Sequence, residues 1–285
     1  MRTTMQAVSR RAAGAGLALA LVTVATADAQ PAAFASARAP SPATPAAPAA
    51  LAPVPFAVGE ELTYKASFGG LPAGTARMRV DGVELVRGRP AYHLVFTLDG
   101  GVPFFRVRDR YESWIDVRTL ASLRHRQQIS EGRYKRTTTY EIYPDRAQYR
   151  KNDEAPQRSV GQPLDDGSFL YAVRVAGVRA GETRREDRYF RPDRNPVVLT
   201  GLRTETVTVG AGTFDATVVR PAIKANGIFA EGGEAQVWFS DDARRYPVQV
   251  KTRFARFSLS LSLESIAPGV DASALPGLIA AAPTP

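Results

Sequence analysis

Residues 257–264 read FSLSLSLE, and this short stretch decides the fold class. Four large apolar side chains occupy alternate positions: Phe257, Leu259, Leu261 and Leu263. Serines and a glutamate fill the positions between and after them. A helix would scatter these residues around its axis, whereas a strand turns successive side chains to opposite faces. The stretch therefore predicts a β-strand with one apolar and one polar face.

The same alternation recurs upstream. Shared faces are formed by Leu62, Tyr64, Ala66 and Phe68, by Ala76, Met78 and Val80, and by Tyr92, Leu94, Phe96 and Leu98. Turn signals separate such runs: Gly69-Gly70, Asp81-Gly82, Asp99-Gly100-Gly101, Glu131-Gly132, Gly210-Ala211-Gly212 and Gly232-Gly233. Their spacing predicts an antiparallel meander. We expect a mainly all-β fold, either one large antiparallel curved sheet that forms a partly open β-barrel, or a β-sandwich.

One segment departs from the period of two. Phe169, Val173 and Ala176 recur at helical spacing, and Asp165-Asp166 precedes them, where a carboxylate caps the first amide groups of a helix. We therefore expect a short helix from Gly167 to Ala176, ended near Gly177. A single helix among many strands is expected to plug one end, or to cover one face, of the curved sheet.

The N-terminal residues predict export. A basic leader is followed by an apolar run over 12–25 and by Ala27-Asp28-Ala29, which is the layout of a signal peptide cleaved before Gln30. The twin Arg10-Arg11 leaves the general and the twin-arginine export routes both open. We expect a signal peptide over 1–29, an Ala/Pro-rich disordered linker over 30–55, one β-rich domain over 56–268 and a disordered tail over 269–285. The expected location is the periplasm, with no transmembrane segment in the mature chain.

Composition narrows the chemistry. The chain has no cysteine, which excludes disulfides and a lipid-modified N-terminus. The formal net charge is +9, and removal of residues 1–29, which hold three arginines and one aspartate, leaves +7. In the expected compartment this charge would attract lipid head groups or cell-wall polymers rather than nucleic acid. The oligomeric state is left open.

Four stretches together resemble the bacterial family of proteins of unknown function called DUF3108. They are Phe56 to Tyr64 (FAVGEELTY), Asp166 to Arg174 (DGSFLYAVR), Glu205 to Ala216 (ETVTVGAGTFDA) and Val237 to Val248 (VWFSDDARRYPV). The resemblance runs from about Phe56 to Ile266, and Gly210 stands where the third stretch is expected to carry proline. It implies an exported, β-rich protein and supplies no catalytic residues.

The candidate ligand-binding residues are basic and aromatic. Arg106, Arg108 and Arg110 alternate, so they should project from one face of a strand as an anion-binding stripe. Neighbouring strands could extend the stripe through Arg124, Arg126, Arg133 and Arg136; the alternative is an ordinary solvated face. Aromatic residues, among them Tyr111, Trp114 and Trp238, either fill the core or line a concave binding surface.

Other polar residues favour structural interpretations. The two histidines, His93 and His125, are too few for a closed zinc site, and no Gly-x-Ser-x-Gly motif marks a nucleophile. We expect no catalytic residue, no metal and no cofactor. Asp241-Asp242 is interpreted as a turn, with Arg244 and Arg245 as partners of the carboxylates, and Glu60-Glu61 as a solvated edge.

Three functions are compatible with these features. The leading hypothesis is a non-enzymatic periplasmic binding or carrier module for an apolar or amphipathic envelope ligand such as lipid. The second is an envelope scaffold that docks on anionic cell wall or lipid. The third is a hydrolase that uses carboxylates from separate strands, a role that requires a carboxylate separation of roughly 5–10 Å.

Overall fold

The computed structural model describes residues 51–102, 104–223, 235–254 and 257–270. The expected signal peptide, nearly all of the expected linker and tail, and the Gly232-Gly233 turn signal lie outside the described residues. The chain divides into two units, 1–45 and 46–285, and every described residue belongs to the second. None of the helices in the described ranges has the length and apolar composition of a membrane-spanning segment.

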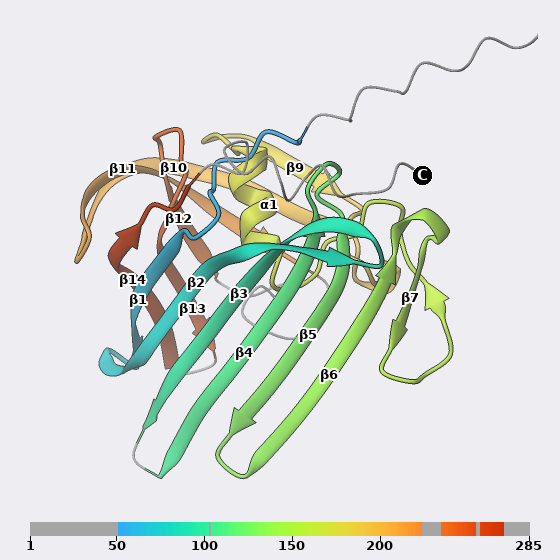
Figure 1. Cartoon of the computed structure of the whole chain (residues 1–285). Helices are drawn as coiled ribbons and strands as arrows, with labels where there is room; N and C mark the ends of the chain where they lie inside the picture. The colour runs from blue at the N-terminus through green and yellow to red at the C-terminus, as the bar shows by residue number, and fades with distance from the viewer. Residues whose placement is uncertain (1–50, 103, 224–234, 255–256, 271–285) are drawn as a thin grey trace, which may run out of the picture. The chain divides into compact units, whose positions relative to one another are not determined.

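The second unit consists mainly of one antiparallel sheet of 14 strands (Figure 1). The strands are β1 (Glu61–Phe68), β2 (Leu71–Val86), β3 (Arg89–Val102), β4 (Phe105–Asp116), β5 (Ser122–Glu131), β6 (Tyr134–Tyr143), β7 (Gln148–Lys151), β8 (Gln157–Arg158), β9 (Thr183–Glu186), β10 (Val197–Val209), β11 (Gly212–Ala222), β12 (Gln236–Ser240), β13 (Pro247–Phe254) and β14 (Phe257–Ala267). The helical segments are α1 (Phe169–Ala176) and the short 3-10 helices η1 (Pro144–Arg146) and η2 (Pro192–Arg194). The predicted fold class is confirmed, in its single-sheet form.

The sheet is an unclosed meander. Its order is β8-β7-β6-β5-β4-β3-β2-β1-β14-β13-β12-β11-β10-β9, so every strand pairs with its neighbour in sequence except at the centre and at the two edges. At the centre β1 pairs with β14, for example Ala66 with Leu261. At the edges lie β8 and β9, which are consecutive along the chain and are joined by the segment that carries α1.

The apolar faces predicted from alternation form one continuous core. Leu62, Tyr64 and Ala66 of β1 are buried, as are Leu261 and Leu263 of β14. The same core contains Phe169, Tyr171 and Val173, so α1 packs against the sheet with its buried side. Figure 1 shows α1 beside the inner face of the curved sheet near one end of the strands. The helix therefore fills part of the interior that the sheet would otherwise leave open.

The helix begins two residues later than predicted and ends as predicted. A turn over residues 166–168 precedes Phe169, and the Asp165 carboxylate accepts hydrogen bonds from the amides of Gly167 and Ser168, both at 2.9 Å. The chain leaves the helix through Gly177, whose φ of 61° is left-handed and suits glycine. Asp165 therefore holds the turn that leads into α1. The expected capping role was wrong in detail, because the N-cap position is occupied by Ser168, whose side chain makes no capping hydrogen bond.

Two turn signals proved wrong. Asp81-Gly82 lies within β2, where the pairing with β3 shifts register between Val80 and Gly82, and Asp99-Gly100-Gly101 lies within β3. A Cβ on Gly100 would lie 2.0 Å from the carbonyl oxygen of Ala73 on the neighbouring strand. Glycine is therefore required at this position because two strands approach closely. From the sequence alone, a glycine required for close approach looks the same as a glycine in a turn.

Candidate functional site

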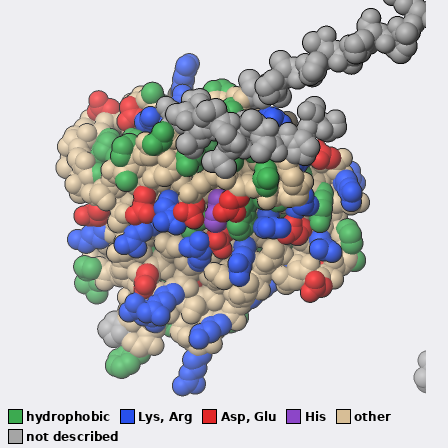
Figure 2. Space-filling view, in the orientation of Figure 1, with side chains coloured by type: hydrophobic (Ala, Val, Ile, Leu, Met, Phe, Trp, Pro, Cys, Tyr) green, Lys and Arg blue, Asp and Glu red, His purple; other side chains and the backbone are tan. Residues whose placement is uncertain are grey.

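The arginine stripe lies on the outward face of β4. Arg106, Arg108 and Arg110 are paired across the strand boundary with Gly101, Asp99 and Thr97 of β3, so they share one face. Arg124 and Arg126 of β5 continue this face, because they lie opposite Trp114 and Glu112. Figure 2 shows the basic and acidic side chains mixed across this surface. Arg133 lies in the β5–β6 turn, and Arg136 lies on the opposite face of β6 and donates to Thr138.

Carboxylates neutralise much of the stripe. Arg106 donates to Asp99 at 2.8 Å, and Arg108 lies 3.8 Å from the same carboxylate. Arg110 donates to Glu112 at 2.9 Å. Burial favours the neutral form of Glu112, but the hydrogen bonds and charges of Arg110 and His93 outweigh burial and lower its pKa.

The three aromatic candidates do not converge with the arginines on one pocket. Trp114 shares the arginine face but is buried, stacked on His93 at 4.4 Å between ring centroids, with its indole N–H donated to Glu84. Tyr111 is on the other face of β4, because it lies one residue from Arg110. Trp238 lies on β12, in the other half of the sheet, and donates to Glu205.

His93 sits among carboxylates on the outward face. Its Nε2 lies 3.2 Å from Glu112 and its Nδ1 lies 2.9 Å from Glu84 and 3.7 Å from Asp81. The described residues contain no group of His, Cys, Asp and Glu side chains arranged to hold a metal ion. The arrangement ties β2, β3 and β4 together across their outer surface.

His125 belongs to a buried polar cluster beneath the start of α1. Ser113, His125 and Asp165 are fully buried, and Ser113 donates to Asp165 at 2.5 Å. The residue types are those of a serine-hydrolase triad, but the geometry is not. In a catalytic triad the serine contacts one ring nitrogen of the histidine and the group that orients the histidine contacts the other. Here the Ser113 hydroxyl and the Glu112 carbonyl both contact Nδ1 of His125. The cluster holds the entry of α1 against β4 and β5.

On the far side of His125 lies a second acidic residue. Gln127 bridges His125 Nε2 and Asp166 at 3.0 and 2.9 Å, and Tyr189 donates to Asp166 at 2.6 Å. Burial, together with the charge and hydrogen bond of Asp166, raises the pKa of Tyr189, so its hydroxyl stays a donor at neutral pH. This bond fastens the segment before η2 to the start of α1.

The expectation that Glu60 is solvated was wrong. Glu60 is 1% exposed and forms a two-pronged ion pair with fully buried Arg174 of α1, with Nη1–Oε1 at 2.6 Å and Nη2–Oε2 at 3.1 Å. Arg174 also donates to the carbonyls of Pro55 and Arg244. One buried guanidinium thus ties the helix to the start of β1 and to the β12–β13 turn.

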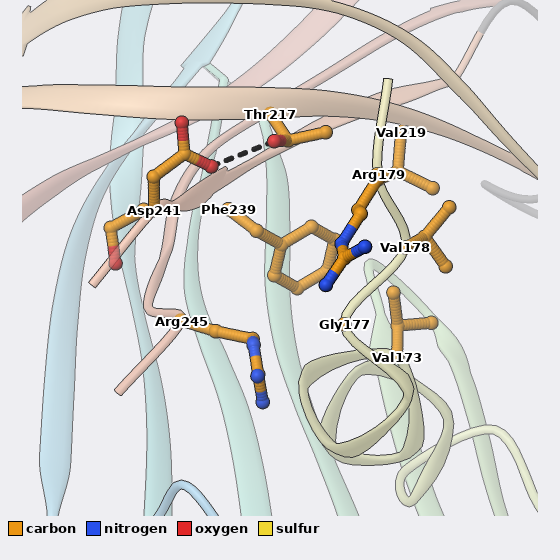
Figure 3. Close-up of a pocket in the computed structure, with 10 residues that line it drawn as sticks. Val173, Gly177, Val178, Arg179, Thr217, Val219, Phe239, Asp241 and Arg245 are labelled. Atoms are coloured by element: carbon orange, nitrogen blue, oxygen red, sulfur yellow. Dashed lines mark hydrogen bonds between the residues drawn. The ribbon is translucent and has the colours of Figure 1, made fainter. Parts of the chain in front are cut away.

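The cavity that best fits a binding site lies beside the C-terminal end of α1. Its volume is about 290 Å³, and it is lined by Val173, Gly177, Val178, Arg179, Thr217, Val219, Phe239, Ser240, Asp241 and Arg245. Figure 3 shows the valines on one side of this space, Asp241 and Arg245 on the other, and the ring of Phe239 between them. The apolar lining residues are buried, and the charged residues are partly or fully exposed.

Local structure fixes the polar rim of the cavity. Asp242 accepts hydrogen bonds from the amides of Arg244 and Arg245, which confirms the turn interpretation of Asp241-Asp242. Arg245 donates to the carbonyl of Arg174, so its guanidinium lies across the end of α1. A Cβ on Gly177 would lie 3.0 Å from that guanidinium, so glycine also makes room for it. Asp241 accepts the Thr217 hydroxyl at 2.7 Å.

The chemistry of the cavity is that of a small amphipathic site. Arg179 is exposed, and its guanidinium has no hydrogen-bonded partner among the residues that the structure describes. Two guanidinium groups and one carboxylate therefore border a space whose walls combine apolar and polar side chains. Guanidinium groups bind carboxylates and phosphates by paired, charge-assisted hydrogen bonds.

Sequence reasoning missed this cavity. The lining comes from three separate segments, 173–179, 217–219 and 239–245, which meet only because β11 and β12 lie next to the end of α1. The only partial signal was the turn at Asp241-Asp242. A second, open pocket of about 780 Å³ lies at the β3–β4 and β5–β6 turns and is bordered by Arg106 of the stripe and by Arg133.

Comparison with known proteins gives a family and distant structural likenesses. A crystal structure from Brucella abortus, described as a beta-barrel-like protein of the domain of unknown function DUF1849, is 8% identical, with a TM-score of 0.49, and the match covers 76% of this chain and 99% of that one. A proposed lipoprotein from Parabacteroides distasonis is 13% identical, with a TM-score of 0.34 and coverage of 75% and 98%. A proposed exported protein with a YmcC-like fold from Bacteroides fragilis is 14% identical, with a TM-score of 0.30 and coverage of 75% and 98%.

The curated proteins offer no match to this chain. The family model described as "Protein of unknown function (DUF3108)" matches residues 63–256. That span lies inside the region, Phe56 to Ile266, over which the four sequence stretches show their resemblance. The chain therefore belongs to the DUF3108 family.

Proposed function

We propose that this protein is an exported, non-enzymatic binding module for a small amphipathic anion. The observation that carries the proposal is the cavity of about 290 Å³, where buried apolar side chains lie beside the guanidinium groups of Arg179 and Arg245 at the rim. The apolar body of the ligand would lie against Val173, Val219 and Phe239. Its carboxylate or phosphate would lie between the two arginines.

The electrostatics of the rim support an anion rather than a cation. Arg245 is held in place by its bond to the carbonyl of Arg174, and the hydroxyl of Thr217 occupies one oxygen of Asp241. The acid is thus already engaged, while Arg179 retains its donors for a ligand. A preformed, partly paired guanidinium rim costs little reorganisation when an anion arrives.

The size of the cavity limits the ligand. Because α1 fills part of the interior of the curved sheet, this space holds about as much volume as ten water molecules occupy in the liquid. A single short acyl chain with an anionic head fits this description. A multi-chain lipid would have to leave most of its apolar surface outside the cavity.

Titration calorimetry with alkyl carboxylates and the matching alcohols would test the proposal. Affinity should rise with chain length until the cavity is full and then level off, and each carboxylate should bind more tightly than its alcohol. Burial of the alkyl chain should give a negative heat-capacity change. Native mass spectrometry of the protein purified from its own compartment should show a bound small anion.

Three variants separate the parts of the site. Arg179→Gln should weaken carboxylate binding by about tenfold and leave the alcohols unaffected, because a charge-assisted hydrogen bond contributes about 1.5–3 kcal/mol. Val219→Phe should fill the cavity and weaken both ligand series. Arg185→Gln, an exposed arginine on β9, is the matched control and should change neither. Equal binding by wild type and Val219→Phe would contradict the proposal.

The scaffold alternative is favoured by a different observation, the apolar and basic turns at one end of the sheet.

A further inference from the structure

Exposed apolar side chains gather at one end of the sheet. The β1–β2, β3–β4 and β5–β6 hairpins all turn at this end, because consecutive strands are antiparallel neighbours. Figure 1 shows these turns at the lower side of the sheet. Among the large apolar side chains that are exposed in the described part of the chain, only Leu85 and Val270 lie away from this end. The other five lie at it: Leu71, Val102, Phe104, Phe105 and Tyr134. We call this end of the sheet the hairpin tip.

The exposure at the hairpin tip is large. Phe104 is 108% exposed and Leu71 is 71% exposed, and half of the Phe105 side chain is also in contact with solvent. Single exposed apolar residues are common, but a group of aromatic and aliphatic side chains at one end of a protein indicates a surface that is covered in use.

Basic side chains surround the same turns. Arg106, Arg108, Arg133, Lys135 and Arg136 are exposed there, against the acids Asp99, Asp109 and Glu131. Of these acids, Asp109 is buried and accepts the amide of Ser130. The exposed charge of the tip is therefore mainly positive. Figure 2 shows hydrophobic and basic side chains together at the lower end of this view.

Apolar and basic side chains line the same open pocket at the hairpin tip. The open pocket of about 780 Å³ is lined by Phe104 and Phe105 and by Arg106 and Arg133, with the glycines Gly100, Gly101 and Gly132 beneath. Aromatic rings and arginines at the same level are the combination that anchors proteins at the boundary between lipid head groups and acyl chains.

We propose that the hairpin tip docks on an anionic phospholipid surface. Phe104, Phe105 and Leu71 enter the head-group boundary, while Arg106 and Arg133 bind lipid phosphates at the hollow between them. The apolar contacts supply binding that persists at high salt, and the arginines supply attraction to anionic lipid that salt screens. A contact of this kind is reversible, because it buries a few side chains and no spanning segment.

Vesicle flotation tests the proposal on the full mature chain. The probes are vesicles of phosphatidylcholine alone and of phosphatidylcholine with phosphatidylglycerol, each at low and high salt. The protein should float with the anionic vesicles, more weakly at high salt, and hardly at all with phosphatidylcholine. The double variant Phe104→Ser/Phe105→Ser should reduce partitioning by about tenfold or more, because it removes both rings that enter the head-group boundary.

The chain offers a matched control. Leu71→Ser removes an exposed leucine from the tip, whereas Leu85→Ser removes one from the other end of β2. Only Leu71→Ser should weaken flotation. Arg106→Gln/Arg133→Gln should weaken the preference for anionic vesicles and reduce the salt dependence, while Arg108, Lys135 and Arg136 retain part of both.

Three results would overturn the inference. The first is flotation that is unchanged in Phe104→Ser/Phe105→Ser or lost equally in Leu85→Ser. The second is concentration-dependent self-association that the phenylalanine variants remove while the wild type fails to float, which would make the tip an interface between copies of this chain. The third is salt-sensitive binding to isolated peptidoglycan without any binding to vesicles.

Discussion

Arg174 is the single charged residue of α1, and it links the helix to two other segments of the chain. It is fully buried, its guanidinium donates to Glu60 and to two carbonyls, and the rings of Phe56, Tyr171 and Tyr246 lie within 6 Å of it at 5.8, 5.7 and 5.4 Å. An ion pair taken out of water is costly to form and more costly to break, because removal of one partner leaves an uncompensated buried charge.

The first prediction concerns this pair. Glu60→Ala should lower the free energy of unfolding by about 3–5 kcal/mol, whereas the double variant Glu60→Leu/Arg174→Met should recover most of that loss. Urea denaturation followed by tryptophan fluorescence measures both. Glu154→Gln, which breaks the exposed pair with Lys151, is the control and should cost about 1 kcal/mol or less. A small effect of Glu60→Ala would show that the pair is dispensable.

The second prediction concerns pH. Arg110 and His93 hold the pKa of Glu112 below its ordinary value of 4.5 despite burial. A carboxyl with a lower pKa in the folded state stabilises the fold above its unfolded pKa and loses this contribution as the pH falls through the folded pKa. Glu112→Gln should therefore be less stable than wild type at neutral pH, and the difference should shrink below about pH 4.5. A constant difference between pH 7 and acid would contradict this explanation.

At the scale of elements, strands were predictable and tertiary contacts were not. Each two-residue period on β1, β2, β3 and β14 is a local property, because a strand sorts its side chains whatever it pairs with. The Glu60–Arg174 pair joins residues 114 positions apart, and no local sequence pattern predicts it. The cavity was invisible for the same reason: Val173, Val219 and Phe239 belong to three elements that only the finished fold brings together.

The third prediction concerns the entry of α1. Asp165 accepts two amides of the turn that precedes the helix and the hydroxyl of Ser113, so Asp165→Ala should destabilise the protein by about 1–2 kcal/mol. Hydrogen exchange should show the loss first in the amides of α1. Asp187→Ala, at an exposed position before η2, should have no such effect. Unchanged exchange in α1 after Asp165→Ala would mean that packing alone holds the helix.

For the described unit as a whole, one seam joins two halves. Strands β1–β8 come from the first part of the chain and β9–β14 from the second, and within the sheet only the β1–β14 pair connects them. A single core nevertheless runs through both halves and includes α1. We therefore expect the halves to unfold together, despite the long sequence separation of the strands at the seam.

The fourth prediction tests this coupling with the two tryptophans, because Trp114 lies on β4 and Trp238 on β12. Leu263→Ala in β14 removes a fully buried side chain at the seam and should cost about 2–5 kcal/mol. In Trp114→Phe and Trp238→Phe backgrounds, the urea midpoint should fall by the same amount, whichever tryptophan remains as reporter. A fall reported by only one of them would show that the halves unfold separately.

The two outermost strands have a consequence for aggregation. A sheet that does not close leaves unpaired amides and carbonyls along its margins, and such margins act as templates on which other chains add strands and grow fibres. Here one margin, β8, has two residues, and the other, β9, has four, three of them charged: Arg184, Arg185 and Glu186. An added strand would find few backbone groups to bond to and, at β9, charged side chains that it would have to desolvate. The protein can thus keep its 14-stranded sheet open without seeding amyloid.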